Sequence, residues 1–372
     1  MGNTVKDERS HLQLFDLIAR DWRVASPVQQ ITFNADDSAV AFASADGTIH
    51  LAATADKASP TLRTRRAIDT GRLTIAPRDK AFLPLKPADF TEGRSSEVVA
   101  FGASGFAFAK DTGRINTLTP GGIAVHMAAR APAAIPVLAA APDGKIIAFG
   151  CGAEVHIAAP NAETGRVLPV KGPVSALAFS ADGMTLAVAH ANGVSRWAMQ
   201  ALDNPPVETP IAGAATALVW HPDGSWLTAS GAENGFYLID TAQNRAVHHS
   251  SFPAPVRSAV FGRTTDTVVA SGAYRVAAWS LPDAGNVVTG KPGLVLINRV
   301  ATCPTRNLVA VGYANGLLCL AEIGQPSEIL LREDTGAGIT AMAWSANGSY
   351  LALAGSDGFA ALVEFPESMF KS

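Results

Sequence analysis

The stretch VSALAFSADGMTLAVAHANGVSRW, residues 174–197, decides the fold. It contains three short runs of apolar and small residues, which are separated by Ala-Asp-Gly at 181–183 and by Asn-Gly at 192–193. Asp-Gly and Asn-Gly are strong hairpin signals, because a type I′ turn requires positive φ at both central residues. The stretch therefore predicts a meander of three antiparallel strands.

The same pattern recurs along the chain with a period of about 41 residues. Five segments align well, at 28–51, 174–197, 215–240, 256–279 and 339–365, and two weaker ones lie at 135–158 and 297–320. One register holds the large aromatics Phe179, Trp220, Phe261 and Trp344. A period of about 40–45 residues is typical of a four-stranded propeller blade. We expect the recurring aromatics to lie in the core between blades, with no chemistry of their own.

These units resemble WD40 repeats, through the pattern V-x-x-L-x-F-S-x-D-G-x-x-L-A followed by D/N-G and a closing Trp. The resemblance covers residues 28–365, but no unit has the family's Gly-His dipeptide or its Trp-Asp pair. Trp197 is followed by Ala198, and Trp279 by Ser280. In the family, that His and Asp belong to a buried hydrogen-bonded network. The resemblance thus implies a degenerate WD40-like propeller, with blades held mostly by apolar packing.

The stretch 57–134 is longer than one period and leaves room for one more blade with an insertion of about 25 residues. We therefore predict an all-β, eight-bladed propeller formed by residues 1–372 as a single domain, with seven blades as the alternative. The best piece of the extra blade is residues 95–115, with Ser104-Gly105 as its turn, and the Arg- and Pro-rich insertion around 61–90 is assigned to this blade 2. In WD40 rings the N-terminal segment commonly supplies the outer strand of the last blade, which removes an exposed sheet edge. Residues 12–24 are expected to close the ring in this way, and a helix over 12–20 is the competing interpretation.

Composition narrows the class of protein. Only 16% of the 372 residues are charged, 48% are hydrophobic and the net charge is −3, which is typical of a compact chain and argues against nucleic-acid binding. The polar N-terminus and the lack of a long apolar window predict neither a secretory leader nor a membrane span. Cys151, Cys303 and Cys319 have no metal-like spacing and indicate a reducing compartment. We expect a cytoplasmic, monomeric protein, and the Ala-rich composition favours a bacterial one.

Motifs for catalysis, metals and cofactors are missing, so we predict no catalytic residue, no metal and no cofactor. Residues 285–292, GNVVTGKP, match a phosphate-binding loop up to the last position, where Pro292 replaces the required Ser or Thr. His248 and His249 are adjacent and would point to opposite faces of a strand, so we interpret them as a solvated pair. His221 leads a turn and is expected to be exposed.

The resemblance directs attention to the face that carries the turns between the second and third strands and the start of each first strand, which we call the turn face. Tyr and Arg are frequent in binding hot spots. The candidate partner-binding residues there are Tyr274, Arg275, Tyr313, Arg257, Arg299, Glu233 and His190.

We predict a non-catalytic scaffold that binds a protein partner on the turn face. The first alternative is a propeller that binds a small molecule or a metal, or a propeller enzyme of the hydrolase or lyase type, and it requires a polar or metal-bearing channel. The second is a quinoprotein-like assembly factor. Residues 110–114 and 161–166 resemble the centre of the quinoprotein repeat element but lack its closing Trp.

Overall fold

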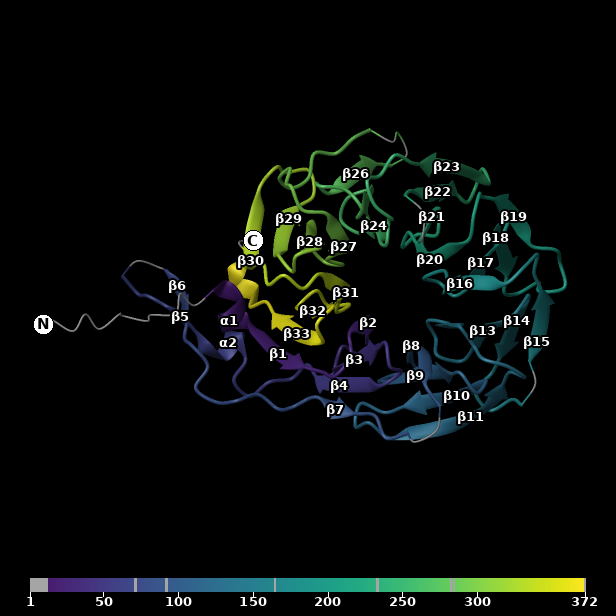
Figure 1. Cartoon of the computed structure of the whole chain (residues 1–372), viewed down its shortest axis with the longest axis horizontal. Helices are drawn as coiled ribbons and strands as arrows, with labels where there is room; N and C mark the ends of the chain where they lie inside the picture. Colours follow the sequence, from purple (N-terminus) through teal and green to yellow (C-terminus); the bar gives the residue numbers. More distant parts are fainter. Residues whose placement is uncertain are drawn as a thin grey trace, which may run out of the picture.

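The computed structural model describes residues 13–69, 72–90, 93–163, 165–231, 234–281, 283 and 285–370. Eight small antiparallel sheets stand in a ring around a central channel (Figure 1). In each sheet the first strand lies innermost, and the inner strands of neighbouring blades contact one another around the whole ring. The all-β fold and the count of eight blades, rather than seven, are confirmed.

The strands follow the chain from blade to blade, starting at the channel in each. Blade 1 has β2 (Val28–Phe33), β3 (Ala39–Ser44), β4 (Ile49–Ala53) and β7 (Lys86–Pro87), and blade 2 has β8 (Ser95–Phe101), β9 (Gly105–Lys110), β10 (Arg114–Leu118) and β11 (Ala124–Arg130). Blade 3 has β12 (Val137–Ala140), β13 (Ile147–Cys151), β14 (Glu154–Ala158) and β15 (Arg166–Pro169), and blade 4 has β16 (Val174–Phe179), β17 (Thr185–His190), β18 (Gly193–Ala198) and β19 (Val207–Pro210).

The second half of the ring repeats this order with one change. Blade 5 has β20 (Ala215–Trp220), β21 (Trp226–Gly231), β22 (Phe236–Asp240) and β23 (Arg245–His249), and blade 6 has three strands, β24 (Ala259–Gly262), β25 (Thr267–Ala270) and β26 (Ala277–Ser280). Blade 7 has β27 (Ile297–Thr302), β28 (Leu308–Tyr313), β29 (Leu318–Glu322) and β30 (Glu328–Arg332), and blade 8 has β31 (Ile339–Trp344), β32 (Tyr350–Gly355), β33 (Phe359–Glu364) and β1 (Ala19–Arg23).

The recurring aromatics lie between blades, as the periodicity predicts. Phe261 is buried, whereas Trp220 and Trp344 are half-buried and reach the channel. The indole of Trp220 donates to the carbonyl of Ala178 on the preceding blade at 3.0 Å, and the indole of Trp344 reaches the preceding blade in the same way. The register therefore joins blades through polar contacts as well as apolar packing, because a buried indole N–H needs an acceptor.

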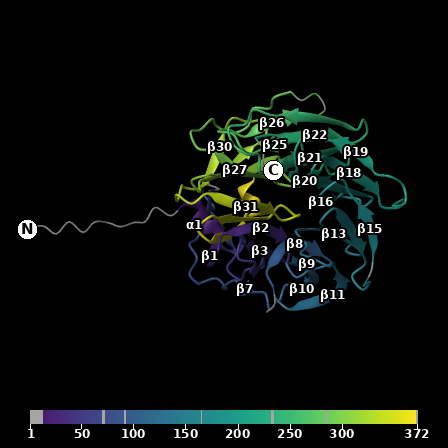
Figure 2. The ribbon, with the colours of Figure 1, turned by 45° about the vertical axis from the view of Figure 1, so that its right-hand side comes forward.

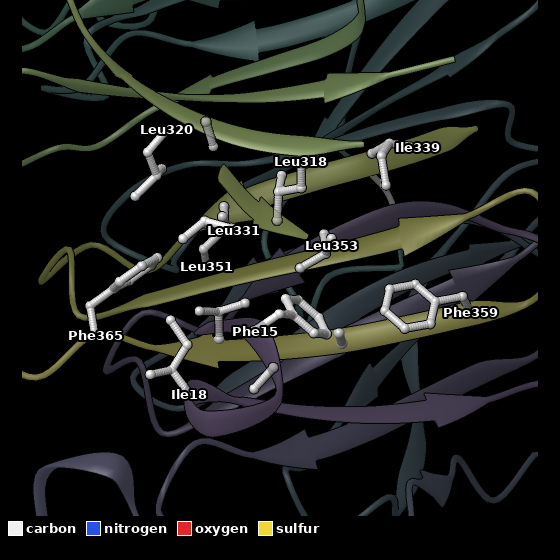
Figure 3. Close-up of a cluster of buried hydrophobic side chains, with 14 residues drawn as sticks. Phe15, Ile18, Leu318, Leu320, Leu331, Ile339, Leu351, Leu353, Phe359 and Phe365 are labelled. Carbon is white, nitrogen blue, oxygen red and sulfur yellow. The ribbon is translucent and has the colours of Figure 1, made fainter. Parts of the chain in front are cut away.

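The ring is closed by the N-terminal segment, as predicted. Strand β1 pairs antiparallel with β33, with Ala19 opposite Val363 and Arg23 opposite Phe359. The competing helix is also present in part, as the short α1 (Leu14–Ile18) just before β1. Figures 1 and 2 both show these purple elements against the yellow C-terminal strands, and in Figure 3 Phe15 and Ile18 lie among the apolar side chains of the last blade.

The insertion lies in blade 1, so its assignment to blade 2 is wrong. It runs from β4 to β7 and contains α2 (Pro60–Arg63) and the hairpin of β5 (Thr64–Arg66) with β6 (Leu73–Ile75). Residues 95–101 are consequently the inner strand of blade 2, and Ser104-Gly105 ends the first turn of that blade rather than the second. The outer strand of blade 1, Lys86–Pro87, is two residues long, which is too short to show any periodicity in the sequence.

The insertion covers the closing strand from outside. The guanidinium of Arg20 is buried, donates to the carbonyls of Ala53 and Thr54 at 2.9 and 2.8 Å, and lies 3.9 Å from Asp56. The indole of Trp22 donates to the carbonyl of Leu83 at 2.9 Å. These contacts make blade 1 and the closure of blade 8 interdependent.

Replacing Arg20 by Ala is expected to lower the free energy of unfolding by about 2–4 kcal/mol, because it leaves two carbonyls without their donor, whereas Asp56 keeps its contact with Arg78. The control is Arg23→Ala on the same strand. The Arg23 side chain is 60% exposed beside Asp357, so its loss is expected to cost less than about 1 kcal/mol. Urea unfolding of both variants measures the difference in stability. Equal losses would show that the contacts of Arg20 do not stabilise the closure.

Candidate functional site

The channel contains a cavity of about 630 Å³, a size within the usual range of ligand pockets. Its walls come from the inner strands of blades 1, 2, 5, 6, 7 and 8 and from the turns that follow them. The ionisable side chains among its lining residues are three arginines and one carboxylate, Arg257, Arg263, Arg299 and Asp37. Asp37 accepts hydrogen bonds from the backbone N–H groups of Ala346 and Asn347, at 2.9 and 2.8 Å. The cavity is therefore polar and predominantly cationic.

Two positions of each inner strand explain how polar side chains reach the channel wall. An innermost strand has no further strand beside it, so its edge N–H and C=O groups need other partners. At the second position, side chains donate to the first carbonyl of the next inner strand. Ser175 donates to Ala215 and Thr340 donates to Val28, both at 2.6 Å.

At the third position, side chains accept hydrogen bonds from N–H groups of the next inner strand. Gln30 both donates to the carbonyl of Val98 at 2.8 Å and accepts from its N–H at 2.9 Å. Ser258 accepts from the N–H of Val300 at 2.9 Å, and Glu97 accepts from the N–H of Leu138. Side chains at these two positions thus connect one blade to the next.

In the register of the repeat, Arg257 (two residues before β24) and Arg299 (in β27) occupy these positions in blades 6 and 7 without joining blades. Arg299 donates only to the carbonyl of its neighbour Asn298, at 3.2 Å. Within the described residues, the guanidinium of Arg257 has neither a hydrogen bond nor an ion pair, and Arg299 has no acidic partner. Burial, together with the positive charge of Arg257, lowers the pKa of Arg299 to about 10. Two cations therefore face one cavity without neutralisation.

Of the other predicted turn-face residues, Tyr274 remains accessible. Its side chain is exposed at 46%, and it lies in the turn between β25 and β26 of blade 6. Glu233 lies outside the described residues, so its predicted role is not placed on the structure.

Three predicted contact residues are used inside the molecule instead. His190 and Tyr313 are buried, and the Tyr313 hydroxyl donates to Glu328 at 3.4 Å. Arg275 donates to the carbonyls of Thr289 and Gly290, at 3.2 and 3.0 Å, and so holds the loop that stands in for a fourth strand of blade 6. These side chains come from strand ends or a turn, but neighbouring outer segments cover them.

His190, Ser195 and Glu208 form a cluster that the sequence does not reveal, in which His190 and Ser195 are buried and Glu208 is 34% exposed. The Ser195 hydroxyl lies 2.9 Å from Nε2 of His190 and donates to Glu208 at 2.9 Å, while Nδ1 of His190 accepts from the N–H of Asn192 at 3.4 Å. A nucleophilic triad requires the carboxylate on Nδ1, so that the histidine can take the hydroxyl proton. Here the carboxylate binds the hydroxyl itself, which makes the cluster a structural network within blade 4.

The remaining sequence motifs also have structural roles. In the 285–292 segment, the N–H of Lys291 donates to Glu328 at 2.8 Å, so this loop is bound to blade 7. His248 stacks on Tyr237 with 4.3 Å between ring centroids, and His249 stacks on Phe236 at 4.9 Å, on opposite faces of β23 as expected. The interpretation as a solvated pair is wrong for His249, whose Nε2 is buried, and holds only for the exposed His248. The predicted exposure of His221 is wrong. The side chain is buried because it lies against Phe261, and its Nδ1 is 2.6 Å from Asp223.

Comparison with known proteins supports a WD40-type ring. Residues 328–362 match the family described as "WD domain, G-beta repeat". This match begins at the outer strand β30 of blade 7 and continues through three strands of blade 8, so it is offset from the blade by one strand. The same offset leaves an N-terminal strand free to complete the last blade.

One solved structure with the same fold is the crystal structure of the computationally designed Ika8 protein, with a TM-score of 0.67 and 18% identity over 95% of this chain and 100% of that one. At this identity the likeness concerns the fold alone. No curated protein matches the chain. Within the described ranges, no helix is long and apolar enough to cross a bilayer.

Glu97 generates a pH prediction. Burial raises the pKa of its carboxyl from about 4.5 to about 7. Between these two pH values the folded protein keeps the proton on Glu97, whereas the unfolded chain has lost it. The free energy of unfolding therefore falls as the pH rises from about 4.5 through about 7. Glu97→Gln is expected to be about 1 kcal/mol more stable than the natural protein at pH 8, where the Glu97 carboxyl is charged, and equally stable at pH 4. The side chain is only partly buried, so this difference is smaller than the full pKa shift would give.

Urea midpoints of both proteins across this range test the prediction. Burial lowers the pKa values of His50, His190 and His249, so both proteins lose stability below about pH 6.5. The difference between the two proteins isolates Glu97. Glu322→Gln, at an exposed position that ends β29, is the control for the removal of one carboxylate. A pH-independent difference for Glu97→Gln would contradict the assignment.

Proposed function

We propose that this propeller is a non-catalytic scaffold that binds a protein partner through its turn face. The observation that carries the proposal is the exposed ring of Tyr274 on blade 6, the blade that also presents Arg257 near the start of its inner strand. An exposed aromatic side chain and an arginine on the same blade provide a large contact area and a directional donor, which are the properties of binding hot spots. WD40-type propellers commonly act as binding platforms, which agrees with this role.

The three free thiols favour a reducing compartment, and the protein is accordingly proposed to act in the cytoplasm. The quinoprotein-like alternative is less well supported. Its two matching segments occupy different places in their blades: residues 111–113 connect β9 to β10, whereas residues 161–165 connect β14 to β15. One repeated element would be expected at one place.

Tyr274→Ala is expected to weaken capture of the partner at least tenfold, because it removes the largest exposed contact on this part of the turn face. The measurement is quantitative mass spectrometry of proteins retained by the immobilised natural protein and by the variant. Asp266→Ala, in the exposed turn at the opposite face of the same blade and outside the cavity lining, is the matched control and should retain the partner.

A partner that is retained equally by both variants would place the interface elsewhere. Loss with Asp266→Ala alone would assign binding to the opposite face. Thermal unfolding of each variant shows whether the exposed substitutions leave the fold intact.

A second candidate function is supported by the channel cavity. The small-molecule alternative requires a polar channel, and the lining arginines make this channel polar. Its four ionisable lining residues include one carboxylate and no histidine, and that carboxylate is bound to backbone N–H groups, so the cavity favours binding rather than catalysis.

A further inference from the structure

We infer that the channel of this propeller contains an anion-binding site in which Arg257 and Arg299 together hold an oxyanion group, such as a phosphate or a carboxylate. The first step is the position of these residues. Both come from inner-strand positions where other blades use Ser, Thr, Gln or Asn to satisfy the edge of the next strand. The guanidinium groups of Arg257 and Arg299 make no such hydrogen bond to the next blade, so packing between blades does not explain why arginines lie there.

The second step is that blades 6 and 7 are connected without the arginines. Ser258 accepts the N–H of Val300, and Thr302 donates to the carbonyl of Phe261 at 2.7 Å. The guanidinium groups are therefore not required to complete this interface and are free to bind a molecule in the channel.

The third step is electrostatic. Partial burial of Arg299 beside a second cation is unfavourable unless an anion neutralises the pair. Asp37 is the one carboxylate among the lining residues, and it is held by two backbone N–H groups of blade 8. Glu97, on the inner strand of blade 2, is bound to Leu138. An external oxyanion is thus the missing counter-charge.

The chemistry of the pair defines the ligand class. A guanidinium presents a planar fork of donors that matches the oxygens of phosphate and carboxylate groups. The cavity volume of about 630 Å³ exceeds the size of a single oxyanion, so the group belongs to a larger molecule. That molecule is either a free organic anion or the phosphorylated or acidic side chain of a docked partner.

The test is isothermal titration of the full-length protein with inorganic phosphate, at constant ionic strength adjusted with chloride. The natural protein is expected to bind phosphate, and Arg257→Gln with Arg299→Gln is expected to weaken binding at least tenfold. Arg245→Gln, at an exposed position on the outer strand β23, is the matched control and should bind normally. Tyr274→Ala should also bind phosphate normally. The anion site is therefore tested independently of the proposed partner interface.

A short peptide with one phosphoserine distinguishes the two sources. Tighter binding of this peptide than of phosphate indicates a partner's side chain, and equal or weaker binding indicates a free anion. If the glutamine variant does not fold, Arg257→Lys with Arg299→Lys keeps both charges but not the planar forks and should still weaken binding. Absence of phosphate binding by the natural protein, or equal affinity in the folded arginine variants, would overturn the proposal.

Discussion

The pairing of β1 with β33 is the contact on which the rest of the ring depends. Without it, blade 8 would end in an open edge. The chain would also no longer connect blade 8 to blade 1, and nothing covalent would hold β2 next to β31 in the channel wall. The pairing joins the two ends of the chain, so the entropy of closing a very long loop opposes it. Apolar packing of Phe15 and Ile18 and the buried donors of Arg20 offset that entropy.

A ring of this kind has an inner edge that no strand covers, and the protein satisfies that edge with side chains. Gln30, Ser175, Ser258 and Thr340 each bind backbone groups of the neighbouring blade. This arrangement makes the channel wall polar even though the blades are rich in Ala and Val. It also places Arg257 and Arg299 among polar side chains of the channel wall.

The repeat and the length of the 57–134 stretch favoured eight blades, because strand alternation and Asn-Gly turns are local properties. The closure was expected from the resemblance to WD40 rings. The position of the insertion was not predictable, since the outer strand Lys86–Pro87 carries no pattern. The burial of His190 and Tyr313 was missed for a related reason: Glu208 and Glu328, which approach them, come from outer strands that the repeat does not place. Arg257 and Arg299 were found by residue type, but only the fold shows that they line one cavity.

The closing strand also has a consequence for synthesis on the ribosome. Residues 19–23 leave the ribosome long before their partner strand, residues 359–364, is made. Throughout elongation the N-terminal segment therefore has no native strand to pair with, and its apolar side chains remain available to chaperones or to other nascent chains. Loss of β33 would leave the same segment permanently unpaired, and an unpaired strand edge favours aggregation over a seven-bladed ring.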